Sequence, residues 1–168
     1  MQLNLANALV FALLEQPGIL DLRRMDLREI DLYGMNLMGA DAREADLTGC
    51  VLAKANLMGA DLRSANLTRA KLDDALLVSA LLSQARLAGA SLRRANLADA
   101  DLSFADLRGA DFTGADLCGA NLQNALLEGA RLVRANLQHA ILPSGWEPEG
   151  HPFTQRIKGG AGWIRLKK

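Results

Sequence analysis

Hydrophobic residues recur at every fifth position over most of this chain. From residue 22 to residue 142, every fifth residue is Leu at 23 of 25 positions, and only Ala42 and Phe112 depart from Leu. Two positions earlier in each repeat, from residue 40 to residue 140, the residue is Ala at 20 of 21 positions. A fixed internal period indicates a repeat architecture, and it has to be recognised before any other pattern is interpreted.

A period of five residues suits neither an α-helix nor a continuous β-strand. A Leu at every fifth position would wander around a helix with 3.6 residues per turn, and it would change faces at each recurrence along a strand. A short extended segment that ends in a corner fits the period. If i denotes the Leu slot, the residues at i and i−2 point inward, and those at i−1, i+1 and i+2 lie outside or at the corner.

The positions of glycine place the corner at i+2. Nine of the fifteen glycines occupy that slot, and the other six lie outside the repeats. Glycine collects where a turn needs a positive φ. The segment Leu37–Asp41 returns as Leu57–Asp61 after twenty residues, which indicates four pentads per coil.

The 24 pentads from Leu20 to His139 resemble the pentapeptide-repeat family. The resemblance implies an all-β solenoid, a right-handed quadrilateral β-helix of about six coils, with Leu or Phe at i and a small residue at i−2 in the core. It does not decide function, because the family includes topoisomerase-protecting proteins, many cyanobacterial proteins of unclear role and others without an assigned activity. Function must therefore be argued from the surface.

The segments outside the repeats predict three parts: an N-terminal helical cap at 1–19, the β-helix at 20–142, and a C-terminal cap with a flexible basic tail at 143–168. Residues 2–14 are strongly apolar, with Asn4 as a candidate N-cap and Pro17-Gly18 as the stop. A signal peptide or membrane anchor is the alternative. We favour the cap, because the segment lacks a positively charged start and is too short to cross a bilayer.

The tail after the last repeat is aromatic and net basic. Trp146 and Phe153 are expected to cover the C-terminal end of the solenoid. Gly159-Gly160-Ala161-Gly162 predicts flexibility, so residues 163–168 are expected to form a mobile basic arm.

Charge and residue types argue against several function classes. The formal net charge is zero, with 19 basic and 19 acidic residues, so no direct nucleic-acid binding is expected. Most aspartates of the repeats stand at i−1, a slot that asparagine also fills, which indicates hydrogen bonding to the corner backbone, since general acid–base chemistry needs a titratable group. We therefore predict no enzymatic activity, no catalytic, cofactor or metal residues, and no membrane partner.

Cys50 and Cys118 are the two cysteines, and they lie about three coils apart in the predicted solenoid. Their Cα atoms should therefore be beyond disulfide reach. Unpaired cysteines are consistent with a reducing compartment, and we expect a cytoplasmic protein.

One side of the predicted coil, centred on Leu37 and on every twentieth residue after it, is depleted of charge. Its candidate partner surface comprises Met38, Met58, Leu76, Val78, Ala98 and Cys118. Depletion of charge with Met enrichment is typical of binding surfaces. The sequence thus predicts an interaction scaffold or regulatory binding module with a protein partner and a possible homodimer. A DNA-mimicking topoisomerase (gyrase) binder is the alternative implied by the family, although the repeats carry only 16 acidic against 14 basic residues.

Overall fold

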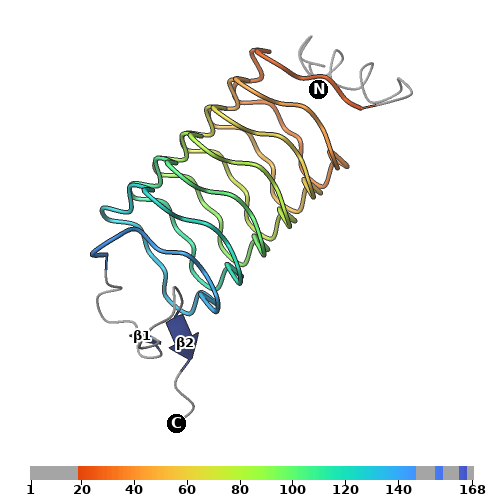
Figure 1. Cartoon of the computed structure of the whole chain (residues 1–168). Helices are drawn as coiled ribbons and strands as arrows, with labels where there is room; N and C mark the ends of the chain where they lie inside the picture. Colours follow the sequence, from red (N-terminus) through yellow and green to blue (C-terminus); the bar gives the residue numbers. More distant parts are fainter. Residues whose placement is uncertain (1–18, 147–153, 157–162, 166–168) are drawn as a thin grey trace.

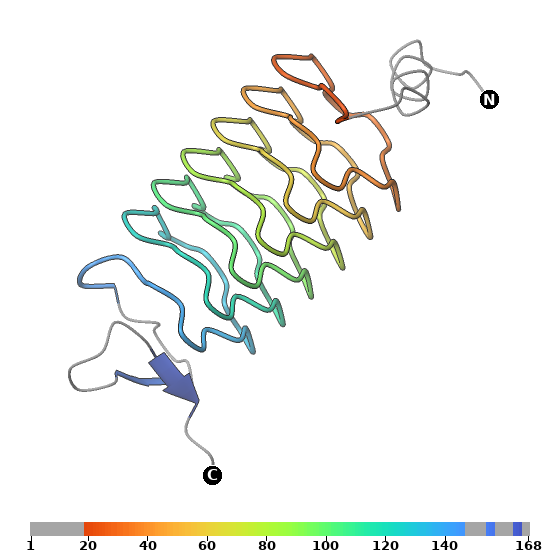
Figure 2. The same cartoon turned by 45° about the vertical axis from the view of Figure 1, so that its right-hand side comes forward.

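A computed structural model describes residues 19–146, 154–156 and 163–165. Between residues 19 and 146 the chain winds into a stack of similar coils (Figures 1 and 2). Parallel bridges join each i−1 residue to the residue twenty positions later, from Asp21–Asp41 to Asn121–Ile141. Four pentads therefore complete one coil, and the four sides predicted from the lag of twenty residues are confirmed.

The interior of the solenoid is filled by the two inward slots of every pentad. The residues at i are buried from Leu22 to Leu137, and those at i−2 are buried alanines over most of the stack. Phe112 takes a Leu position and is fully buried. Among the described residues no polar or charged side chain is buried, so the core is held by the packing of Leu against Ala.

The first coil carries larger residues at i−2. Ile30 is buried, and Leu20, Met25 and Met35 are partly buried and pack against the core. The helix predicted to rest on this apolar floor falls in residues 1–18, outside the described residues.

The corners lie at i+2, as the glycines predicted. All corner residues from Arg24 to His139 have a positive φ, between 55° and 71°. Nine of them are glycine and fifteen are not, so a side chain stands in the left-handed region at most corners. This corner after every fifth residue limits each stretch of parallel pairing to a single bridge.

Every backbone N–H of a typical pentad has an acceptor, which explains the aspartate and asparagine at i−1. In the pentad of Leu62, the N–H groups at i−1, i and i+2 bond to neighbouring coils, and the N–H at i−2 closes the preceding turn. The remaining donor, the N–H of Arg63, bonds to Oδ1 of Asp61 at 3.2 Å. The predicted role of these residues as caps of the corner backbone is confirmed, and the same bond recurs along the stack.

After the last coil, Trp146 packs against the core, and its backbone N–H donates to the carbonyl of Pro143. The expected contact of Phe153 lies outside the described residues. Strands β1 (Thr154–Arg156) and β2 (Trp163–Arg165) pair antiparallel, with Gln155 opposite Ile164. The sequence did not predict this pairing.

Candidate functional site

We number the four sides of the coil by their first Leu slots: side 1 from Leu22, side 2 from Leu27, side 3 from Leu32 and side 4 from Leu37. The candidate partner surface lies on side 4. Five of its residues occupy the i+1 slot in consecutive coils and form one column: Met38, Met58, Val78, Ala98 and Cys118. The corner residue that follows a column member donates its backbone N–H to the carbonyl of the member in the next coil, for example Gly59 N–H to the Val78 carbonyl at 3.0 Å.

Exposure of the column is greatest in the early coils. Met38 is 63% exposed and Met58 is 37% exposed. Leu76 stands beside the column in the i−1 slot and is 41% exposed, while Val78, Ala98 and Cys118 are half-buried. The structure therefore brings all six predicted residues onto one side, and the large apolar side chains that reach solvent are Met38, Met58 and Leu76.

Leu76 also leaves a backbone group without its usual side-chain partner. In neighbouring coils Oδ1 of Asn56 and of Asn96 accepts from the N–H at i+1, at 3.2 and 3.1 Å. Leu76 has no oxygen to offer to the N–H of Val78. Asn or Asp in this slot would accept a hydrogen bond from the backbone N–H at i+1. The solvent-exposed Leu76 cannot accept it, so this local hydrogen bond is lost.

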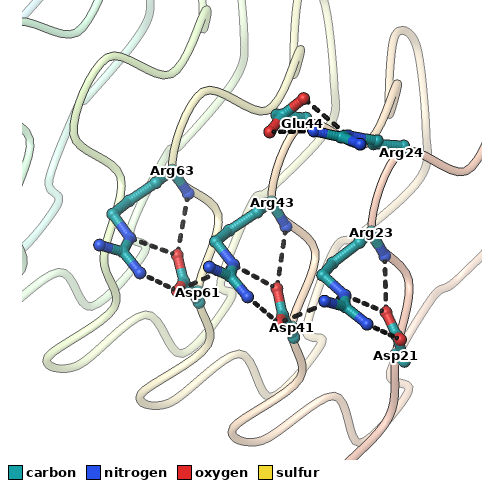
Figure 3. Close-up of polar contacts among 8 residues, drawn as sticks. All are labelled: Asp21, Arg23, Arg24, Asp41, Arg43, Glu44, Asp61 and Arg63. Carbon is teal, nitrogen blue, oxygen red and sulfur yellow. Dashed lines mark hydrogen bonds and ion pairs between the residues drawn. The ribbon is translucent and has the colours of Figure 1, made fainter.

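Side 1 presents the opposite character in its first three coils, where charges form a continuous ladder (Figure 3). Each arginine at i+1 pairs with the aspartate at i−1 of its own pentad, at 2.6, 2.7 and 2.6 Å, in the pairs Arg23–Asp21, Arg43–Asp41 and Arg63–Asp61. Arg23 and Arg43 also approach the aspartate of the next coil, at 3.7 and 3.6 Å. The column of stacked aspartates is thus offset by an adjacent column of opposite sign.

These ion pairs, and the pair Arg28–Asp26 on side 2, lower the pKa of the aspartates. The hydrogen bonds from Arg23 lower the pKa of Asp21 to about 2, and those from Arg28 lower the pKa of Asp26 to about 2. The pKa of Asp41 and that of Asp61 are also lowered, chiefly by the side-chain bonds from Arg43 and Arg63. The carboxylates therefore stay ionised and paired, which is the behaviour of a neutralised surface.

The two cysteines are free. Cys50 is buried and its Sγ donates to the Leu27 carbonyl at 2.6 Å, and burial raises the pKa of its thiol to about 11. Burial also raises the pKa of Cys118 on side 4.

Within the part of the chain that the structure describes, no cluster of His, Cys, Asp or Glu could hold a metal ion. No helix among those same residues is long and apolar enough to span a membrane.

A family model of pentapeptide repeats matches the chain with 8 copies, over residues 21–52, 43–77, 75–114 and 110–143. The chain belongs to the pentapeptide repeat family. The resemblance inferred from the Leu and Ala slots is confirmed by this match. No curated protein matches the chain at a significant level.

Solved structures of other pentapeptide repeat proteins resemble this member of the family. One from the thylakoid lumen of Arabidopsis thaliana is 32% identical, with a TM-score of 0.59, and the match covers 60% of this chain and 70% of that one. A trypsin-treated form of QnrB1, a plasmid-mediated fluoroquinolone resistance protein, is 20% identical with a TM-score of 0.62, over 74% of this chain and 67% of that one. At this identity, the QnrB1 match supports the fold alone.

Several exposed apolar residues lie outside the predicted surface. Leu81, Phe104, Leu126 and Val133 are all exposed. Leu81 and Leu126 occupy i−1 slots and Phe104 a corner, so a scan of every outward slot for large apolar residues would have found them.

Proposed function

We propose that this pentapeptide repeat protein is a non-enzymatic binding module that docks a protein partner through side 4. The observation that carries the proposal is the column from Met38 to Cys118, which is uncharged at i+1 through five consecutive coils. Four steps of about 4.8 Å make this column about 19 Å long, enough for a short partner helix or strand. Apolar residues aligned in one column form a patch, and charge-depleted patches are favoured at binding surfaces.

The rigidity of the solenoid supports such a role. Each coil is bonded to its neighbours by its backbone and filled by fully buried Leu and Ala, so outward residues are held at a fixed spacing. A partner then binds side chains whose backbone is already fixed, so little conformational entropy is lost on binding.

The proposal is tested by introducing charge into the column. We expect Met58→Glu/Val78→Glu to lose the partner that wild-type protein captures from native lysate. Glu is compatible with an i+1 slot, since Glu128 occupies the i+1 slot of side 2 in the last coil. The matched control Thr68→Glu/Ala88→Glu places the same charges at half-buried i+1 positions of side 2 and should keep the partner. Equal capture by both variants would rule out side 4 as the docking surface.

The alternative is a topoisomerase binder that mimics DNA. The side 1 aspartates of the first three coils are neutralised by their arginines, which weakens a resemblance to the charge of DNA. A gyrase supercoiling assay distinguishes the two functions, because the mimic would inhibit or protect gyrase and a scaffold for another partner would leave supercoiling unchanged.

The right-handed winding, the N-terminal helical cap and the cytoplasmic location remain part of the proposal. The winding rests on the family, whose members form right-handed quadrilateral β-helices, and the location rests on the two free cysteines.

A further inference from the structure

Coils four to six, residues 80–139, divide their charges between two opposite halves. One half consists of sides 4 and 1, residues 80–84, 95–104, 115–124 and 135–139, and contains no Lys or Arg. Its ionised residues are Asp99, Asp101 and Asp116. We call it the acidic half.

Sides 2 and 3 of the same coils, residues 85–94, 105–114 and 125–134, form the basic half. It carries six arginines against three carboxylates, and the arginines are Arg86, Arg93, Arg94, Arg108, Arg131 and Arg134. Sides 2 and 3 lie across the four-sided coil from sides 4 and 1, so the two halves face opposite directions.

The charges of the acidic half are not neutralised within the solenoid. Asp101 and Asp116 occupy i−1 slots, but Ser103 and Cys118 stand where the ladder of side 1 has arginine, and they donate only their backbone N–H groups. Within residues 19–146 no ion pair involves Asp101, Asp116 or Asp99.

Part of the basic half is held in ion pairs, and the rest interacts with its carboxylates only at longer range. Arg94 pairs with Asp74 and Arg108 pairs with Asp106. The other four arginines, Arg86, Arg93, Arg131 and Arg134, make no ion pair within 4.0 Å among the described residues.

Each half also exposes large apolar side chains. Leu81 and Phe104 lie on the acidic half, and Leu126 and Val133 lie on the basic half. Phe104 is 59% exposed and stands at a corner with a φ of 59°, a conformation that is unfavourable for a bulky side chain. An aromatic residue that is both strained and solvent-exposed is well suited to serve as an anchor that a partner covers.

We propose that copies of this protein associate side by side, with the acidic half of one copy against the basic half of the next. Three features of the chain favour a second copy as the occupant: the halves have opposite charge, both expose apolar anchors, and both repeat at the same spacing of about 4.8 Å per coil. Because the halves face opposite directions, the contact is heterologous and repeats without closing.

This inference goes beyond the proposed function, because it concerns a second copy of the chain and the charges of coils four to six, and it shares only Ala98 and Cys118 with the side 4 column. It is tested on purified protein alone, so it can fail while capture of a separate partner succeeds, and the reverse also holds.

The first test measures mass by sedimentation equilibrium against protein concentration. At about 0.01 M salt, where charges act over about 30 Å, the mass should rise continuously with concentration. At about 1 M salt, where the range falls to about 3 Å, the mass should return toward the 18.0 kDa monomer. A monomer at every concentration in low salt, or a mass that stops at a dimer, would overturn the proposal.

The second test mixes two variants that each retain one half. Asp101→Asn/Asp116→Asn keeps the basic half, and Arg131→Gln/Arg134→Gln keeps the acidic half. Asparagine fits both aspartate columns, as Asn121 and Asn136 show. Each variant alone should stay monomeric, and an equimolar mixture should form a dimer. Failure of the mixture to associate would refute a contact between unlike halves.

Two further variants separate this contact from a general effect of charge. Phe104→Ser changes no charge, and Ser64 occupies the same corner column with a φ of 59°, so the variant should fold and associate less than wild type. Asp31→Asn/Asp46→Asn removes two carboxylates outside both halves and should associate as wild type does. Loss of association in the Asp31/Asp46 variant, or undiminished association of Phe104→Ser, would contradict the proposed surface.

Discussion

Each corner of the solenoid imposes an energetic cost on any side chain that occupies it, because φ is positive at every i+2 position. An L-residue loses about 1–2 kcal/mol in the left-handed region, while glycine costs about 0.4–1 kcal/mol in added freedom of the unfolded chain. Exchanging the two at a corner should therefore change the free energy of unfolding by about 0.5–1 kcal/mol, as the difference between these terms. Ser79→Gly is expected to stabilise the protein, and Gly59→Ala to destabilise it.

Gly59 and Ser79 are a matched pair, since they occupy the same corner column in neighbouring coils, with φ of 62° and 55°. A Cβ added at Gly59 would meet no atom within 4 Å, so its cost is confined to the backbone. At Gly119, in the same column, an added Cβ would clash with Oδ1 of Asp99, the free end of an exposed side chain. Gly119→Ala should thus cost about as much as Gly59→Ala, because the Asp99 side chain can rotate away.

The assay is urea unfolding of each variant, followed by circular dichroism. In the predicted order of stability Ser79→Gly comes first, wild type second, and Gly59→Ala and Gly119→Ala come last at similar values. A neutral Gly59→Ala together with a destabilising Ser79→Gly would refute the argument that the corners are strained.

Three other changes have defined outcomes. Ala42 is buried in a column of Leu, and Ala42→Leu should stabilise the fold by about 2 kcal/mol, read as a higher melting temperature; a lower one would mean that a neighbour already fills the space. Leu76→Asn should supply the missing acceptor for the Val78 N–H and stabilise by about 1 kcal/mol in thermal unfolding; an unchanged melting temperature would show that water serves that group equally well. The pKa of Asp21 and that of Asp26 fall from 3.8 to about 2 on folding. Their ion pairs therefore stabilise the folded state fully above pH 3.8, and this stabilisation is lost as the pH falls toward 2. The melting temperature should therefore drop more steeply over this range in wild type than in Asp21→Asn/Asp26→Asn, and identical slopes would contradict the assignment.

The interior and the register could be predicted from the sequence because each inward slot tolerates few residue types. Leu at i and Ala at i−2 fit one space repeated in every coil, so the pattern survives along the chain and determines which residues are buried. The return of Leu37–Asp41 at Leu57–Asp61 was sufficient to predict four sides. The caps at i−1 followed from the exchange of Asp for Asn, since both offer an oxygen to the corner N–H.

The outward slots were less predictable because solvent tolerates many side chains there. Arg24 pairs with Glu44 across neighbouring coils at 2.9 Å, and Lys54 lies 5.7 Å from the centre of the Tyr33 ring. These contacts depend on rotamers that no slot preference determines. The six residues of the candidate surface could be placed on one side by counting, but the exposure that separates Met38 from Ala98 required the structure.

The assignment of residues to four sides underlies every proposed surface, and a distance between two spin labels tests it directly. Ala53 and Val133 both lie at i+1 on side 3, eighty residues apart, and Cys50→Ala/Cys118→Ser removes the native thiols. With twenty residues per coil, labels at Ala53→Cys and Val133→Cys are four steps of about 4.8 Å apart, about 19 Å in all. A three-sided coil of fifteen residues would separate them by more than five steps, about 26 Å. A distance near 19 Å supports the four-sided arrangement, and one near 26 Å would contradict it.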